Sequence, residues 1–342
     1  MRENRDEIGG LGALLKIASR RASAAVSRLR RAALILPGLT LAVAAAGFLG
    51  GSTPARAADN FMVGPTACQN CHKPEFEVWS KTKHSTSFNE FHRLPKVRDV
   101  LKATNERSPK QSKVCVTCHY TTAQKDAAAK PDQVAGPACE SCHGPASKWI
   151  TIHNDFGGAG VKAADEKPDH KAKRIADAKA AGMVRPESKF DVVENCYGCH
   201  ALGRPDVDGK VLGAMIDNGH PTNDDFEFVR YAEGQVRHRF YPPDTSANKE
   251  MTPQLKAEWY AVGQAAALVA ASQGASKSDN AKYKAAETAR IAKAKEVLGK
   301  IPEAKQLLAT PTADAGRAFS AAINGKDLTK VVGALPEPST YK

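Results

Sequence analysis

The sequence is poor in aromatic residues and has only one long apolar run. Aromatic residues make up 6% of its 342 residues, whereas hydrophobic residues (42%) and charged residues (25%) are at levels usual for a folded soluble protein. This composition excludes a disordered chain. Only residues 32–50 approach the length that spans a membrane, so a protein with several membrane spans is also excluded. The length allows one or two domains with a real core.

The first 57 residues have the pattern of an export signal. Residues 1–31 are basic and rich in Ser and Ala, residues 32–50 are apolar, and Pro54-Ala55-Arg56-Ala57 offers small residues at both specificity positions of a cleavage site. We expect cleavage after Ala57. The alternative is an uncleaved membrane anchor, although Pro37, Gly38 and Gly47 in the apolar run weaken a spanning helix. In either case the sequence predicts an exported, periplasmic protein.

All eight cysteines occur as four pairs with the same two-residue gap, and no cysteine is left over. A His follows every pair, in Cys68-Gln-Asn-Cys71-His72, Cys115-Val-Thr-Cys118-His119, Cys139-Glu-Ser-Cys142-His143 and Cys196-Tyr-Gly-Cys199-His200. This spacing lets both sulfurs form thioethers with the vinyl groups of one haem, and the adjacent His then points at the iron. Zinc ribbons and disulfide frameworks also use paired cysteines, but neither needs a His after every pair. The sequence therefore predicts four covalently bound haem c groups with four proximal His ligands.

The net charge of +12 is a weak argument for a nucleic-acid partner. Nine of the basic residues and three acidic ones lie in residues 1–57, and the remainder of the chain carries +6. The two propionates of each haem offset this excess further. We therefore expect no nucleic-acid partner.

Two of the other histidines belong to an internal repeat. Gly64-Pro65-Thr66-Ala67-Cys68 leads through the first motif to Trp79 and His84, and Gly136-Pro137-Ala138-Cys139 leads through the third motif to Trp149 and His153. The repeat predicts a duplicated module with a binding loop, a short helix, a Trp packed on a porphyrin and a His at the helix end. Each His lies only 12 or 10 residues after the proximal His of its module, so we expect it to bind the iron of a neighbouring haem.

Two late histidines complete the set of distal candidates. Gly219 and Pro221 restrict the backbone around His220, as a ligand requires. His238 is expected to end a helix that runs from about residue 225. Neutral imidazoles on both faces give low-spin iron with no open position, and no Met has a convincing setting as a ligand. We expect mostly bis-His haems, with distal ligands His84, His153, His220 and His238.

The last two histidines are not expected to bind iron. His92 would lie on the same helix as His84, and His170 lies in a charged stretch where we expect a surface residue.

The predicted fold is mainly α-helical with long loops. Between the motifs the chain is polar and rich in Ala, Lys, Gly and Pro, with little strand signal. From residue 252 onward, residues 254–273, 279–300 and 313–323 are Ala-rich helical stretches with long charged side chains on one side. We expect a leader at 1–57, a compact multihaem cytochrome c domain at 58–245 and a helical C-terminal appendage at 246–342. This appendage would pack Trp259, Tyr260 and Leu268 against the haem domain; the alternative is a docking element for a redox partner.

The four motifs together resemble the tetrahaem cytochromes of the cytochrome c-554 type, periplasmic electron acceptors of hydroxylamine oxidoreductase. The resemblance covers about residues 64–241 and is most specific around Cys68 and in the block GPACESCHGPASKW. It implies distal ligands at His84, His153 and His238, and an open sixth position on the second haem. The Gly-His-Pro setting of His220 departs from that pattern, since His220 could close the second haem.

These features predict an electron carrier rather than an enzyme. The expected role is one-electron relay between a periplasmic oxidoreductase or membrane quinol oxidase as donor and a cytochrome or reductase as acceptor, with a membrane contact only if the leader stays uncleaved. The alternative is a haem enzyme that acts on a small nitrogen or sulfur compound at a five-coordinate second haem (Cys115, Cys118, His119). That alternative requires an iron without a distal ligand.

Overall fold

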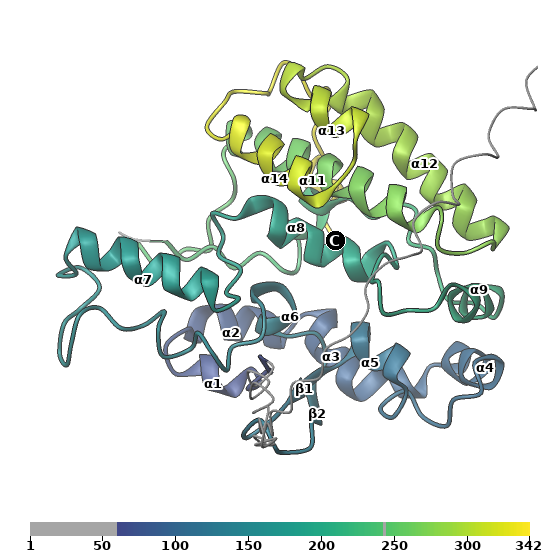
Figure 1. The fold of residues 1–342 in the computed structure, drawn as a ribbon, viewed down its shortest axis with the longest axis horizontal. Coiled ribbons are helices and arrows are strands. Elements are labelled where there is room, and N and C mark those ends of the chain that lie inside the picture. The colour runs from purple at the N-terminus through teal and green to yellow at the C-terminus, as the bar shows by residue number, and fades with distance from the viewer. Residues whose placement is uncertain (1–59, 242–243) are drawn as a thin grey trace, which may run out of the picture. The chain divides into compact units, whose positions relative to one another are not determined.

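The computed structural model describes residues 60–241 and 244–342, so the predicted leader at 1–57 lies outside the described residues. The mainly α-helical fold is confirmed (Figure 1). The α-helices are α1 (Thr66–Gln69), α2 (Lys73–Ser80), α3 (Lys83–Glu90), α4 (Pro95–Ala103), α5 (Lys113–His119), α6 (Cys139–His143), α7 (Pro168–Ala180), α8 (Lys189–His200), α9 (Gly209–Asp217), α10 (Phe228–Ala232), α11 (Pro253–Gly274), α12 (Ala281–Leu298), α13 (Lys305–Ala309) and α14 (Ala313–Ala322).

Three short 3₁₀-helices and one small sheet complete the described elements. The 3₁₀-helices are η1 (Phe91–Arg93), η2 (Pro302–Ala304) and η3 (Pro338–Thr340). Strands β1 (Thr121–Ala123) and β2 (Asp132–Ala135) pair antiparallel, with Thr122 opposite Gln133. The sequence has few stretches that favour strands, and this agrees with the single small sheet of the described residues.

Polar residues at the start of the helices decide where many of them begin. The side chains of Thr82, Ser112 and Thr252 accept a hydrogen bond from the backbone N–H three residues later, at the starts of α3, α5 and α11. Such caps satisfy N–H groups that have no partner inside the helix. The caps of α3 and α5 matter for the site, because these helices carry His84 and the second Cys-His motif.

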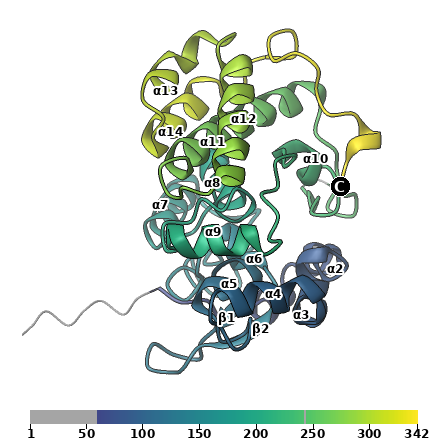
Figure 2. The ribbon, with the colours of Figure 1, turned by 90° about the vertical axis from the view of Figure 1, so that its right-hand side faces the viewer.

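The largest hydrophobic core lies in the C-terminal half and includes the helix of the fourth motif. Helix α11 packs against α8, α10, α12 and α14, and Phe190, Val193 and Tyr197 of α8 are buried in this core (Figures 1 and 2). The expected packing of the extension against the haem region is present, since Trp259 stacks on Phe228 with ring centres 5.2 Å apart. The predicted boundary after residue 245 therefore divides helices that share one core.

Helix α11 differs from its prediction. We expected charged side chains along one side, but residues from Ala257 to Val269 are buried on almost every side. Ala-rich sequence lets neighbouring helices approach from several directions, because small side chains leave room for close packing. Helix α11 is therefore the central helix of the C-terminal half.

Outside this largest core, the described residues form two smaller apolar clusters. Ala146, Trp149 and Ala178 form one, and Leu202, Val207, Leu212, Ile216 and Tyr283 form another beside α9. Apolar burial is scarce where the Cys-His motifs are densest. In the described residues, no helix is long and apolar enough to cross a membrane.

The histidine-bearing segments differ in part from their predictions. Helix α10 ends at Ala232, so His238 lies in a loop and does not end a helix. His84 lies at the start of α3 and not at the end of the helix that carries Trp79, because Thr82 caps a new helix between them. His153 lies in a hydrogen-bonded turn, and His92 lies in η1 rather than on α3.

Candidate functional site

Each Cys-His motif forms a helical turn. The second, third and fourth motifs end helices α5, α6 and α8, and the first runs from α1 to the N-cap of α2. Residues three apart on a helical turn lie on one face, so the two sulfurs of a motif are neighbours. The next residue, His, follows at the end of that turn. This local geometry is the one that a covalent haem requires.

The tertiary structure brings each proximal His opposite one distal candidate. The ring centres are 6.4 Å apart for His72 and His153, 6.2 Å for His119 and His220, 6.3 Å for His143 and His238, and 6.0 Å for His200 and His84. Two imidazoles that each bind one metal ion at about 2.0 Å place their ring centres about 6 Å apart. All eight histidines predicted as ligands thus form four pairs with the spacing of axial ligands.

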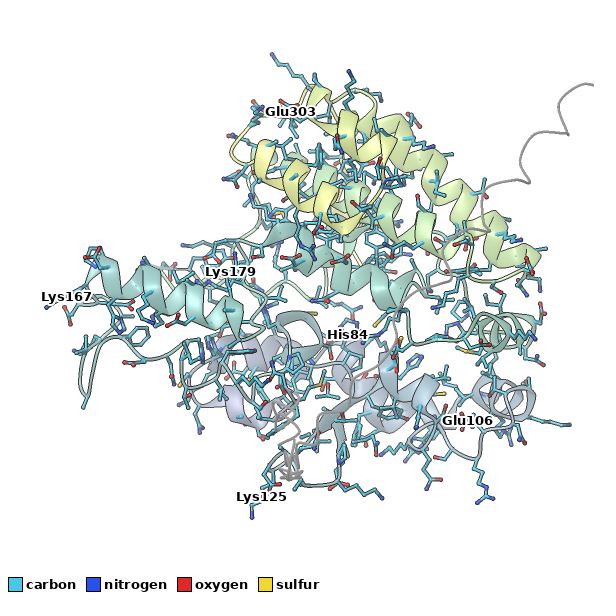
Figure 3. The ribbon with its side chains drawn as sticks, in the orientation of Figure 1. His84, Glu106, Lys125, Lys167, Lys179 and Glu303 are labelled. Carbon is cyan, nitrogen blue, oxygen red and sulfur yellow. The ribbon has the colours of Figure 1, made fainter. Side chains whose placement is uncertain are left out.

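Every distal His faces a motif from another part of the chain. His84, after the first motif, lies in the interior opposite His200 of α8 (Figure 3). His153, after the third motif, lies opposite His72 of the first. This arrangement is the one expected for ligation across neighbouring haems.

Backbone carbonyls orient several of these rings. The Nδ1 atoms lie 2.9 Å from the carbonyl of Val184 for His143, 2.6 Å from Ile150 for His153, 2.9 Å from Pro221 for His220 and 2.6 Å from Val236 for His238. A ring that donates its Nδ1 proton to a carbonyl leaves the Nε2 lone pair free for a metal. Four of the eight rings are therefore held in the tautomer that a haem ligand needs.

Burial keeps the imidazoles neutral. Desolvation is the main cause that lowers the pKa of His84, His143, His153 and His220 below the ordinary value of 6.5. Burial, with neighbouring histidines, lowers the pKa of His119 and His200 to about 4. Only the neutral ring can donate an electron pair to iron, so these rings are in the ligand form at neutral pH.

The cysteines place the motifs in two close pairs. The Cys68 sulfur lies close to the Cys139 sulfur, and the Cys118 sulfur lies close to the Cys199 sulfur. The neighbouring sulfur and burial raise the pKa of Cys68 and Cys118, whereas the neighbouring sulfur lowers the pKa of Cys199 to about 7. No disulfide joins any of the eight cysteines in the described residues. The first motif therefore adjoins the third, and the second adjoins the fourth.

Buried donors without a partner show that the surroundings fit a haem. Within the described residues, Tyr120 Oη, Trp149 Nε1, Arg204 Nε and Arg290 Nη1 are buried and have no hydrogen-bond partner, and the same holds for one acceptor, Glu287 Oε1. Tyr120 follows His119, and the Trp149 ring contacts His153 edge-on, 5.2 Å between centres. Buried donors normally have partners, and the carboxylates of a haem would supply them. The sulfur pairs, the neutral imidazoles and these donors all suit haem c.

Three supporting features were not predicted from the sequence. Phe91 stacks on His119 and Phe226 on His200, with ring centres 3.9 and 4.2 Å apart. The buried Glu140 carboxylate, inside the third motif, accepts hydrogen bonds from the N–H groups of Val63, Gly64 and Ala146. The sequence could have indicated the role of Glu140, because a charged residue stands there between two cysteines. It contains no such indication for the two phenylalanines, because stacking depends on the tertiary structure.

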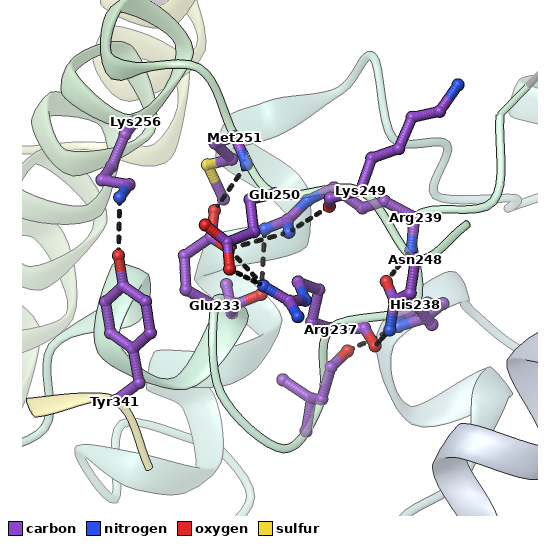
Figure 4. Close-up of polar contacts among 12 residues, drawn as sticks. Glu233, Arg237, His238, Arg239, Asn248, Lys249, Glu250, Met251, Lys256 and Tyr341 are labelled. Carbon is purple, nitrogen blue, oxygen red and sulfur yellow. Dashed lines mark hydrogen bonds and ion pairs between the residues drawn. The ribbon is translucent and has the colours of Figure 1, made fainter. Parts of the chain in front are cut away.

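A polar network positions the loop of His238. Asn248 accepts a hydrogen bond from Arg239 N–H at 2.9 Å and donates one to the Arg237 carbonyl at 2.6 Å, so its amide bonds to the backbone on both sides of His238 (Figure 4). The fully buried side chain of Glu233 pairs with Arg239 and accepts a hydrogen bond from Met251 N–H. The extension beyond residue 245 thus supplies contacts that hold a candidate ligand.

The sequence comparisons agree with this geometry. A family model described as cytochrome c554 and c-prime matches residues 67–144, which contain three of the four motifs. The chain is also similar to cytochrome c-554 from Nitrosomonas europaea, with 29% identity over an alignment of 167 residues that covers 46% of this chain. Both matches support a member of the cytochrome c554 family. Membership of this family implies a c-type cytochrome with covalently bound haem c.

The similarity to that relative is partial. The match spans 65% of the relative's length, just under two thirds. No solved structure matches the chain. The family model ends at residue 144, so the fourth motif, His220, His238 and the C-terminal helices lie beyond it.

Proposed function

We propose that this cytochrome c554 family member binds four haem c groups, each between two histidines, and relays electrons one at a time between proteins. The observation that carries the proposal is the set of four His–His pairs, each of which joins a motif His to a distant His at 6.0–6.4 Å. The thioether positions are Cys68 and Cys71, Cys115 and Cys118, Cys139 and Cys142, and Cys196 and Cys199. The iron ligands would be His72 with His153, His119 with His220, His143 with His238, and His200 with His84.

The residues of the chain would set how easily each iron exchanges an electron. Haem iron, when bound, supplies the one-electron couple. The two neutral imidazoles of each His–His pair would hold one iron between them and would favour a low potential. The two close motif pairs would keep successive haems near one another, which favours rapid transfer within the chain. These properties suit a carrier.

The placement of His220 favours a carrier over a small-molecule enzyme. An enzyme at the second haem would need an open iron, but the His220 ring lies 6.2 Å from His119 and its Nδ1 is directed to the Pro221 carbonyl. A six-coordinate second haem would be a difference from the five-coordinate site implied by the family resemblance. We propose that this chain has no open iron.

The cellular setting is part of the same proposal. The basic and apolar leader predicts export, and covalent attachment of haem c takes place outside the bacterial cytoplasmic membrane. We propose a periplasmic protein that accepts electrons from an oxidoreductase or a membrane quinol oxidase and passes them to a cytochrome or reductase.

The test is a haem count combined with carbon monoxide binding. The protein would be produced in a host that matures c-type cytochromes, and the haem per chain measured from the pyridine haemochrome spectrum. We expect four haems per chain and a dithionite-reduced spectrum that carbon monoxide does not change. A count other than four would refute the tetrahaem proposal. A carbon monoxide shift in one haem of four would refute full bis-His ligation and favour the enzyme.

A further inference from the structure

Most of the excess positive charge of the described chain lies in one segment. Residues 81–113 contain nine Lys and Arg but only three Asp and Glu, whereas the other described residues carry 31 basic and 30 acidic side chains. We call these nine cations the basic surface: Lys81, Lys83, Arg93, Lys96, Arg98, Lys102, Arg107, Lys110 and Lys113.

The charges of the basic surface are available to a partner. Eight of the nine are exposed, and Lys110 is half-buried over the ring of Phe88. Among the described residues, only Lys83 of this set forms an ion pair, with Glu90 at 4.0 Å. Unpaired like charges on one surface raise the local potential and attract an opposite charge. The segment therefore presents a positive face to solvent.

Part of the basic surface adjoins the second haem site. Phe91, in the same segment, stacks on His119, and Lys113 begins the helix that holds Cys115. The Lys96 side chain lies against Gly219, the residue before His220, at 3.4 Å from an ideal Cβ there. The segment thus reaches both the proximal and the distal side of this site.

An apolar residue lies among the cations. Leu94 is 51% exposed, one of few large hydrophobic side chains so exposed in the described residues, and it lies between Arg93 and Lys96 in the sequence. An apolar contact surrounded by charged side chains is the usual arrangement of a protein docking site. Helix α4 contributes only its charged side to this face, because Val97 and Val100 are buried.

We propose that the basic surface is the docking site of an acidic redox protein that exchanges electrons with the second haem. This inference rests on the proposed function, which places a haem between His119 and His220. Charge steering would raise the association rate, and Leu94 would supply the apolar contact. In each encounter one electron passes between the partner's centre and the haem iron, so a reduced donor is oxidised as one ferric haem becomes ferrous.

The test uses an acidic [2Fe–2S] ferredoxin as the electron donor. The variant K96E/R98E/K102E reverses three exposed charges of α4. The matched control K293E/K295E/K305E makes the same change in net charge on α12 and α13, which lie on the opposite side of the fold from α4 (Figures 1 and 2). Stopped-flow reduction of the holoprotein gives the second-order rate constant. At low salt we expect a loss of about tenfold or more for the α4 variant and little change for the control.

Three further measurements decide whether the basic surface is a docking site for a redox protein. High salt should remove the difference between the variants, since salt screens exposed charges. Reduction by a neutral small molecule should be equal in all three proteins. Equal slowing of both variants, or of neither, would overturn the docking proposal. Binding of the wild type to anionic phospholipid vesicles, lost in the α4 variant while ferredoxin kinetics stay unchanged, would also overturn it, since the partner would be a membrane.

The haem count separates this inference from the proposed function. Fewer than four haems per chain in the wild type would refute the tetrahaem proposal itself. Four haems with identical ferredoxin kinetics in all variants would refute only the docking site.

Discussion

Gly136 allows the third motif to approach the helix that carries His84. An ideal Cβ at Gly136 would lie 1.9 Å from the His84 carbonyl oxygen and 2.8 Å from Ser87 Oγ. Real Cβ atoms are essentially never closer than 3.0 Å to such neighbours, so the variant G136A must move the His84 backbone by about 1.1 Å. A metal site tolerates displacements of only about 0.5 Å. We therefore expect G136A to detach His84 from the fourth haem.

Carbon monoxide reports the loss of this ligand. The reduced wild type should not respond, whereas reduced G136A should bind carbon monoxide at one haem of four. Overpacking of this kind also costs about 1–3 kcal/mol of folding free energy, which denaturant unfolding would measure. The control is G203A, because an ideal Cβ there meets Ala270 Cβ at an ordinary 3.6 Å. It should behave like the wild type.

If G136A does not bind carbon monoxide, the variant H84A shows whether the backbone clash was relieved elsewhere or His84 was the wrong ligand. If H84A binds carbon monoxide but G136A does not, His84 is the ligand and the backbone clash is relieved elsewhere. If neither variant binds carbon monoxide, His84 is not the ligand of the fourth haem. Either result would refute the prediction for G136A.

Three more predictions concern other parts of the site. The variant H220A should open the second haem to carbon monoxide and added imidazole should close it again, whereas H92A should leave all haems closed. The variant N248A removes both hydrogen bonds beside His238, so it should lower the unfolding free energy by about 1 kcal/mol per bond and alter the EPR signal of one haem, whereas the exposed N89A should do neither. Arg174 and His170 lower the pKa of Glu166 from 4.5 to about 2, so Glu166 stabilises the fold above pH 4.5 and this contribution is lost as pH falls to about 2. Denaturant unfolding at a series of pH values should show a flatter curve in this range for E166Q than for the wild type.

The network around Glu166 also changes the interpretation of His170. The sequence predicted only a surface residue in a charged stretch. In the structure His170 Nδ1 lies 2.8 Å from the buried Glu166 carboxylate, which also binds Arg174, and Arg174 donates to the His153 carbonyl at 2.7 Å. A charged stretch can thus support the loop of a candidate ligand, because its charges pair with one another instead of facing solvent.

Local chemistry allowed the sequence alone to identify the haem-attachment motifs, the helical class and the set of eight candidate ligands. Each of these depends on residues close together in the chain: a motif is five residues long, and Gly219 and Pro221 constrain His220 directly. The choice of partner for each His depends on long-range packing, which residue spacing does not encode. Only the tertiary structure decided that His84 lies opposite His200 and His220 opposite His119. For the same reason, the sequence could not show that Asn248, beyond the expected domain boundary, holds the backbone around His238.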